Sequence, residues 1–146
     1  MKARMLVAMT AVVALFSAAV IAEDPNLEGV KCVVAGSKDA KATNSVDYKG
    51  GKVFFCCQNC PKAFQKDTAK FAASANHQLV ATGQAKQEKC PFSGGPINQD
   101  TAIEVKGVKV AFCCEKCQGK AKESTDQVDL IFNDKAFDKG FVVSKK

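Results

Sequence analysis

The sequence is poor in the side chains that most enzymes use outside thiol chemistry. Its 146 residues include no tryptophan, one tyrosine and one histidine, and the only arginine is Arg4. It contains no phosphate-binding loop, Ser-His-Asp set or HExxH motif, and its acidic residues show no pairing for acid–base catalysis. With no other arginine, the chain lacks guanidinium groups for two-point binding of phosphates or bases. These absences argue against nucleic-acid binding and leave cysteine as the residue expected to carry chemistry.

The first 22 residues predict export. Lys2 and Arg4 precede an apolar run that ends at Ile21. This is the layout of a secretory signal peptide (residues 1–22), with cleavage expected after Ala22 and a secreted or periplasmic mature chain. The alternative is an uncleaved membrane anchor, although the run barely reaches the ~20 residues that a span needs. Removing this segment lowers the formal net charge from +6 to +4, and no membrane span is expected after it.

The remainder of the chain is a duplication. With an offset of 57 residues, the stretch VDYKGGKVFFCCQNC (46–60) falls on IEVKGVKVAFCCEKC (103–117), and all three cysteines match. Self-similarity of this kind indicates repeated structural units. We therefore predict an N-terminal linker at 23–31, followed by two copies of one unit at 32–89 and 90–146.

Each copy is expected to form a cysteine-bearing turn, a β-hairpin, a helix and a short closing strand. β-branched and aromatic residues on both sides of residues 49–51 predict the first hairpin. A periodic apolar face from Phe64 to Ala75 predicts a helix that starts near the CC-x-x-C and stops by Gly83. The corresponding helix of the second copy is expected to be weaker or broken, because it contains Gly119 and a Ser-Thr-Asp run.

The fold class that follows is α+β. Copies this small bury too little surface to be stable alone, so we expect them to pack together about a pseudo-twofold axis. Closing strands are expected at 84–89 and 141–143. Phenylalanines at helix or strand period usually belong to a core rather than to a site. The candidates for this core are Phe54, Phe55, Phe64, Phe71, Phe112, Phe132, Phe137 and Phe141.

All eight cysteines lie in the two copies and follow one pattern, an early single cysteine and a later CC-x-x-C. They are Cys32, Cys56, Cys57 and Cys60, then Cys90, Cys113, Cys114 and Cys117. Cysteines three or four residues apart share a face at a helix start, where the helix dipole favours thiolate. A hairpin that folds back would bring the early cysteine beside them. Three or four converging sulfurs suit Zn²⁺ or Cu⁺, one ion per copy.

The spacing also carries a resemblance. One cysteine, then a hairpin containing YKGGKVFFC, then C-x-x-x-C resembles the heavy-metal-binding modules called TRASH and YHS domains, over nearly the whole mature chain. The resemblance implies treble-clef-like units in which turn, hairpin and helix carry the ligands. The implied ligands are Cys32, Cys56 and Cys60 in the first copy and Cys90, Cys113 and Cys117 in the second. Those modules usually have a small residue where this chain has Cys57 and Cys114, which are therefore extra thiols or fourth ligands.

Two other uses of the cysteines stay open. Export permits disulfides, such as Cys32 with Cys56 or Cys60, although adjacent cysteines rarely meet disulfide geometry. The C-x-x-C at the helix start also has the local layout of a thioredoxin-type redox pair, which is the enzyme alternative. The copies are too short for a thioredoxin fold. His77 is replaced by Asp134 in the second copy, so it is expected to be a surface histidine rather than a ligand.

The sequence thus predicts an exported, non-enzymatic protein that holds Zn²⁺ or Cu⁺ through thiolates for buffering, delivery or sensing. Its expected partners are metal ions and a metal-receiving or membrane protein. The turns that would bring each early cysteine close contain glycine, at Gly36, Gly50, Gly94 and Gly107.

Overall fold

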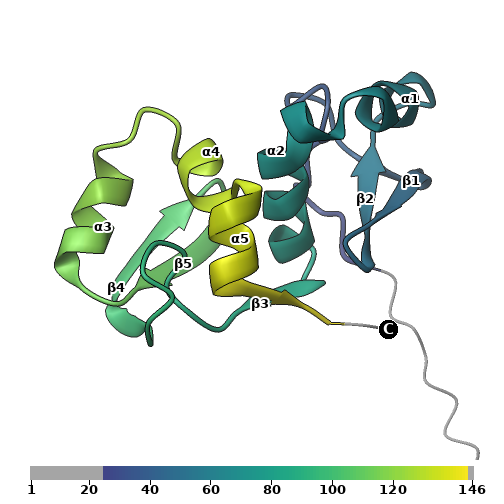
Figure 1. Cartoon of the computed structure of the whole chain (residues 1–146). Helices are drawn as coiled ribbons and strands as arrows, with labels where there is room; N and C mark the ends of the chain where they lie inside the picture. Colours follow the sequence, from purple (N-terminus) through teal and green to yellow (C-terminus); the bar gives the residue numbers. More distant parts are fainter. Residues whose placement is uncertain (1–24, 145–146) are drawn as a thin grey trace, which may run out of the picture.

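The computed structural model describes residues 25–144, which form a mixed α+β fold with small two-stranded sheets and five helices (Figure 1). The predicted signal peptide lies outside the described residues. None of the helices in the described part of the chain is long and apolar enough to cross a membrane. Below, residues 25–89 are called the first half and residues 90–144 the second half.

Each half contains one β-hairpin. In the first half β1 (Lys41–Tyr48) pairs antiparallel with β2 (Gly51–Phe55). In the second half β4 (Asn98–Val105) pairs in the same way with β5 (Val108–Phe112). Apolar side chains at the ends of β2 and β5 are buried, which anchors the residues that follow them.

Both hairpins turn on a Lys-Gly pair. The φ angles are 49° at Lys49 and 86° at Gly50, and 45° at Lys106 and 82° at Gly107. Positive φ at two consecutive turn residues is the conformation of a type I′ turn, whose twist matches that of the strands. Glycine adopts it at no steric cost. The predicted hairpins and the place of their turn glycines are confirmed.

The closing strands of the two halves pair with each other. β3 (Ala85–Gln87) lies antiparallel to β6 (Phe141–Val143), with Lys86 opposite Val142. Beside this sheet, the carbonyl of Gly140 accepts hydrogen bonds from the backbone amides of residues 88 and 89 at 2.9 and 3.0 Å. Both segments are extended as predicted, and their pairing joins the C-terminal ends of the two halves.

The first half has two helices where the sequence predicts one. α1 (Asn59–Lys66) and α2 (Thr68–Ala81) are separated at Asp67, where φ is −145° and ψ is 71°. The Asp67 side chain accepts a hydrogen bond from the Lys70 amide at 3.2 Å and so caps α2. The apolar period continues through this break, which is why periodicity alone does not reveal it.

The second half is broken into shorter helices, as predicted. α3 (Glu115–Lys122) is followed by α4 (Gln127–Phe132) and α5 (Asp134–Gly140). The side chains of Asp126 and Asn133 cap α4 and α5 by accepting backbone hydrogen bonds. Each cap adds a helix start, so the chain breaks between α4 and α5 over a length comparable to the uninterrupted α2.

One core joins the halves. In Figure 1 α2, α4 and α5 lie in the middle, with the β1–β2 hairpin and α1 on one side and the β4–β5 hairpin and α3 on the other. Seven of the eight predicted core phenylalanines are at most 4% exposed, and Phe71 is partly buried against them. The cluster of buried residues includes members of both halves, so the two units share their hydrophobic stabilisation.

Polar contacts add to this interface. The Lys49 ammonium lies 2.9 Å from a carboxylate oxygen of Asp134 and 2.6 Å from one of Asp138. The Tyr48 hydroxyl donates to Asp134 at 3.2 Å. The buried Asn76 amide donates to the Phe132 carbonyl at 2.8 Å. The first hairpin and α2 are thereby tied to α4 and α5.

Candidate metal centres

Three sulfurs converge in the first half. The Sγ atoms of Cys32, Cys56 and Cys60, here called the first cluster, all lie within 4.8 Å of one another. Cys56 follows β2, Cys60 is the second residue of α1, and their Sγ atoms are 3.7 Å apart. The early cysteine therefore lies beside the later pair, as the sequence predicts.

The second half repeats this arrangement. The Sγ atoms of Cys90, Cys113 and Cys117, the second cluster, also lie within 4.8 Å of one another. Cys113 follows β5 and Cys117 lies in the first turn of α3, with 3.6 Å between their Sγ atoms. Both clusters consist of cysteines alone.

A tight turn places each early cysteine. The amide of Gly36 donates to the Cys32 carbonyl at 2.8 Å, and that of Gly94 donates to the Cys90 carbonyl at 2.8 Å. Both glycines have positive φ, 65° and 74°, which side chains rarely adopt. The turn directs backbone amides toward the sulfur, and the Ala35 amide lies 3.4 Å from the Cys32 Sγ.

The two remaining thiols lie beside the clusters. The Sγ of Cys57 is 3.5 Å from that of Cys60, and the Sγ of Cys114 is 3.6 Å from that of Cys113. Neither is part of the two sets of three sulfurs that all lie within 4.8 Å of one another. Both residues are exposed. They are accordingly neighbours of the clusters rather than members.

Each cluster has a buried side and an open side. Cys32 is 2% exposed and Cys90 is 0% exposed, whereas Cys56, Cys113 and Cys117 are only partly buried. The protein core shields the early sulfur, and solvent reaches the cluster from the helix start. An ion bound here would contact a buried sulfur on one side and would be accessible to solvent on the other.

The thiols of a cluster differ in their tendency to ionise. Burial opposes ionisation of Cys90, but hydrogen bonds from the backbone and hydroxyl of Ser93 outweigh it and lower the Cys90 pKa to about 7. The pKa of Cys32 is also lowered, because backbone amides, that of Ala35 foremost, outweigh its burial. Burial raises the pKa of Cys60, and burial with neighbouring thiols raises that of Cys117 to about 12. A cation that binds all three sulfurs must therefore displace protons.

The helix start acts on the exposed thiols. Backbone hydrogen bonds from Cys60 and Asn59 lower the pKa of Cys57 to about 7. A backbone hydrogen bond from Cys117 likewise lowers the pKa of Cys114. This is the effect expected of amides and a dipole at a helix N-terminus.

Ser93 is a site residue that the sequence reasoning missed. Its hydroxyl donates to the Cys113 Sγ at 3.2 Å and so links the early turn to the end of β5. The first half has Ala35 at the matching place, as alignment of CVVAGS with CPFSGG shows. This difference between the two copies could have identified Ser93, because a serine hydroxyl close to a cysteine can donate a hydrogen bond to sulfur.

His77 is not the surface histidine that the sequence predicts. It is partly buried between the halves, with Nε2 3.0 Å from the Val105 carbonyl and its ring edge-on to Phe132 at 5.0 Å. Burial lowers its pKa. The expectation failed because it rested on one copy, whereas the other half supplies these contacts. His77 belongs to neither cluster.

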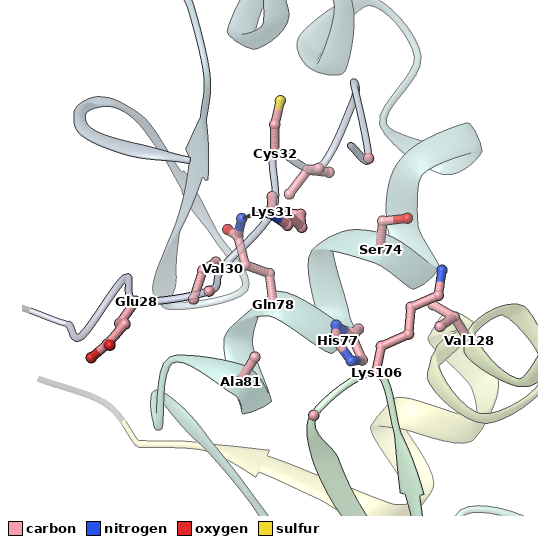
Figure 2. Close-up of a pocket in the computed structure, with 14 residues that line it drawn as sticks. Glu28, Val30, Lys31, Cys32, Ser74, His77, Gln78, Ala81, Lys106 and Val128 are labelled. Carbon is pink, nitrogen blue, oxygen red and sulfur yellow. Dashed lines mark hydrogen bonds between the residues drawn. The ribbon is translucent and has the colours of Figure 1, made fainter. Parts of the chain in front are cut away.

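A cavity of about 300 Å³ lies next to His77 (Figure 2). The first half lines it with Val30, Gln78 and others, and the second half with Lys106 and Val128. In Figure 2 the sulfur of Cys32 points away from His77 and Lys106. The cavity and the first cluster therefore lie on different sides of Cys32.

Comparisons of the chain with protein-family models, with curated proteins and with solved structures found no match in any of the three.

Proposed function

We propose that this protein binds one soft metal ion at each cysteine cluster, Zn²⁺ or Cu⁺, and buffers, delivers or senses that metal outside the cytoplasm. The observation that carries the proposal is the convergence of three Sγ atoms to within 4.8 Å in both halves. The chain uses the same three kinds of position twice: an early turn, the end of a hairpin and the first turn of a helix.

The sulfur separations fit metal coordination. Four ligands at Zn–S bonds of about 2.3 Å stand about 3.8 Å apart in a tetrahedron, and three in a plane stand about 4.0 Å apart. In the structure the separations are 3.7 Å between Cys56 and Cys60 and 3.6 Å between Cys113 and Cys117. These two pairs would require only small adjustments to share an ion, and the early sulfur of each cluster lies within 4.8 Å of both members of its pair.

The donor set favours a soft ion. Thiolates select Zn²⁺, Cu⁺ and related metals over Mg²⁺ or Ca²⁺, which prefer oxygen. Three thiolates complete a trigonal Cu⁺ site, whereas Zn²⁺ takes a fourth ligand from water or a further thiol. The ion is proposed as cargo rather than as a catalytic cofactor.

Exposure favours exchange over permanent structural binding. Structural zinc sites are closed by four protein ligands, whereas each cluster here has three and an open side. The core formed by both halves is extensive and includes residues far from the sulfurs. Metal release is therefore compatible with a folded chain, which buffering and delivery require.

The finer parts of the proposal concern ancestry and location. We propose that the halves are copies of one treble-clef-like unit of the TRASH or YHS type, related by a pseudo-twofold axis. The repeated sequence and the antiparallel pairing of β3 with β6 support this. The predicted signal peptide supports a secreted or periplasmic location, and a metal-receiving protein is the proposed partner.

Metal and thiol analysis of one sample tests the function. The chain is purified from its own compartment, its metal content is measured, and free thiols are counted before and after a chelator. We expect two equivalents of metal and six thiols that become reactive only with the chelator. A sample with no metal and no free thiol would overturn the proposal in favour of disulfides.

A redox role is the second candidate. It rests on the first half, where the exposed Cys57 thiol has a pKa of about 7 and lies 3.5 Å from Cys60. This is the arrangement of a C-x-x-C pair with an activated first thiol. Turnover of a disulfide substrate by the metal-free chain, abolished in C57S, would favour this role over metal binding.

A further inference from the structure

Each half places one exposed thiol at the open side of its cluster. Cys57 and Cys114 are exposed, and each has its Sγ 3.5 to 3.6 Å from one cluster sulfur. The duplication provides two independent instances of the feature. Adjacent cysteines are poor disulfide partners, so pairing of Cys57 with Cys56, or of Cys114 with Cys113, does not account for them.

The sulfurs of each half form a series from the core to the surface. In the first half Cys32 is 2% exposed, Cys60 is 9% exposed, Cys56 is partly buried and Cys57 is exposed. The second half runs in the same way from the buried Cys90 to the exposed Cys114. The Cys60 sulfur lies 3.7 Å from that of Cys56 and 3.5 Å from that of Cys57, and the Cys113 sulfur lies 3.6 Å from those of Cys117 and Cys114. Each of these pairs is close enough to bind one ion together, because sulfurs about 3.8 Å apart share a metal.

We propose that Cys57 and Cys114 are exchange ligands, through which the bound ion passes to a partner that presents at least two cysteine thiolates. The inference rests on the proposed function. It assigns the exposed thiols a part in transfer and leaves the resting ion to the three sulfurs of each cluster.

The step is a ligand exchange without change of oxidation state. In the first half Cys57 loses its proton and its sulfur bonds to the ion, while the bond from the ion to Cys32 breaks and the Cys32 sulfur takes up a proton. The ion has then moved to the exposed side. Thiolates of the partner next replace Cys56, Cys60 and Cys57 in turn, and the vacated sulfurs are protonated. The second half performs the same exchange with Cys114 and Cys90.

The geometry favours exchange over permanent four-sulfur binding. A permanent fourth ligand must approach all three cluster sulfurs, but Cys57 and Cys114 are outside the sets whose members all lie within 4.8 Å. Each instead lies close to one sulfur of its cluster, that of Cys60 or that of Cys113. A thiol that reaches the ion only when another sulfur leaves is suited to transfer.

Alkylation of the loaded chain tests the resting state. The chain with two bound ions is treated with iodoacetamide, and each cysteine is scored by mass spectrometry. We expect Cys57 and Cys114 to be alkylated at the rate seen in the metal-free chain, with the six cluster cysteines protected. Protection of Cys57 and Cys114 together with the clusters would show that they are permanent ligands and would overturn the inference.

Transfer kinetics test the exchange itself. The loaded chain is mixed with a synthetic peptide that contains a Cys-x-x-Cys pair, and transfer of the ion is followed with time. We expect the C57S/C114S double variant to bind two ions and to transfer them about tenfold more slowly. The matched control is Gln58→Ser, an exposed neighbour of Cys57, which is expected to transfer at the wild-type rate.

The outcomes separate this inference from the proposed function. A wild-type chain that binds two ions, with a double variant that transfers them at the wild-type rate, would overturn the exchange role alone. A wild-type chain that binds no metal would overturn the proposed function, and the exchange role would fall with it.

Discussion

The two halves reach similar sulfur geometry with different helices behind it. The first half continues from α1 into the 14-residue α2, whereas the second half uses α4 of six residues and α5 of seven. The distance between the two later sulfurs of each cluster nevertheless differs little, 3.7 Å against 3.6 Å. The clusters are therefore set by the early turn, the hairpin end and the first helical turn, which the halves share.

The halves differ more in what supports the early turn. Ser93 links the turn of the second half to the Cys113 sulfur at 3.2 Å. The first half has Ala35 there, and its amide at 3.4 Å is the contact to Cys32. Hydrogen bonds to the sulfur of a metal ligand orient that ligand and tune its basicity. The second cluster should thus be the better organised of the two.

Removal of an early cysteine should produce the largest effect. Changes to groups that only support metal ligands cost about 10 to 100-fold in affinity, so loss of a ligand should cost more than about 100-fold. We expect C32S to bind one ion, at the second cluster, and C90S to bind one ion, at the first. Isothermal titration with metal measures the number and affinity of the sites in each variant.

Circular dichroism of both variants provides the control, because each should retain its helices. Loss of both ions from C32S in a folded chain would contradict the independence of the clusters.

A backbone clash should disturb the second half selectively. A Cβ at Gly140 would lie 2.9 Å from the Lys89 carbonyl oxygen and 2.9 Å from the Pro91 Cα, next to Cys90. Overpacking of this kind costs about 1 to 3 kcal/mol. We expect Gly140→Ala to lower the free energy of unfolding by that amount and to weaken the second cluster more than the first, as chemical denaturation and metal titration would show.

Gly119→Ala is the matched control within α3. A Cβ there meets nothing within 4 Å, so we expect stabilisation by about 0.5 to 1 kcal/mol. Equal weakening of both clusters by Gly140→Ala would show that the halves do not respond separately.

Replacement of two asparagines at matching places in the repeat should lower the free energy of unfolding by different amounts. The Asn76 amide is fully buried and donates to the Phe132 carbonyl at 2.8 Å and to Asp134 at 3.0 Å. Asn133 caps α5 by accepting from the Ala136 amide at 3.0 Å. We expect Asn76→Ala to cost about 1 to 3 kcal/mol, because it leaves a buried carbonyl unpaired. Asn133→Ala should cost about 1 kcal/mol.

Urea denaturation of the two variants measures the difference. A larger cost at Asn133 would argue that local capping, rather than contact between the halves, dominates the stability of this interface.

Exchanging the residues of the early turns should have the smallest effect. Burial raises the pKa of Cys90, and the backbone and hydroxyl of Ser93 are the first of the contacts that lower it to about 7. Ser93→Ala removes the hydroxyl, so we expect a higher Cys90 pKa and less thiolate at neutral pH. Ala35→Ser should shift the Cys32 pKa in the opposite direction. Ultraviolet absorbance of thiolate against pH measures both changes.

A higher cysteine pKa should weaken metal binding at a given pH, since protons compete with the ion for sulfur. Both clusters should lose metal as pH falls, and Ser93→Ala should lose it from the second cluster at a higher pH than the wild type does. Release at the same pH in both chains would show that Ser93 has no influence on the second cluster.

The sequence was sufficient to predict the elements that carry the sulfurs. The hairpins have strong local signals, a Lys-Gly turn between β-branched strands, and the duplication showed that Cys32 and Cys90 belong to the same pattern as the later cysteines. Because a hairpin has few ways to fold back, placing the early cysteine beside its end required no knowledge of the other half.

What the sequence could not predict depends on contacts between the halves. Three features depend on residues distant in sequence. They are the burial of His77, the contacts of Lys49 with Asp134 and Asp138, and the pairing of β3 with β6. The break at Asp67 was missed for another reason. The apolar period runs through it, and the cap that an aspartate provides competes locally with helix continuation.

X-ray absorption spectroscopy of the chain loaded with Zn²⁺ or Cu⁺ tests most directly whether three cysteines in each half bind one ion. The prediction is two ions per chain, each with at least three sulfur ligands at about 2.3 Å. The C32S and C90S variants should each retain one such ion. A spectrum dominated by nitrogen or oxygen ligands, or a single ion that both variants lose, would contradict the account.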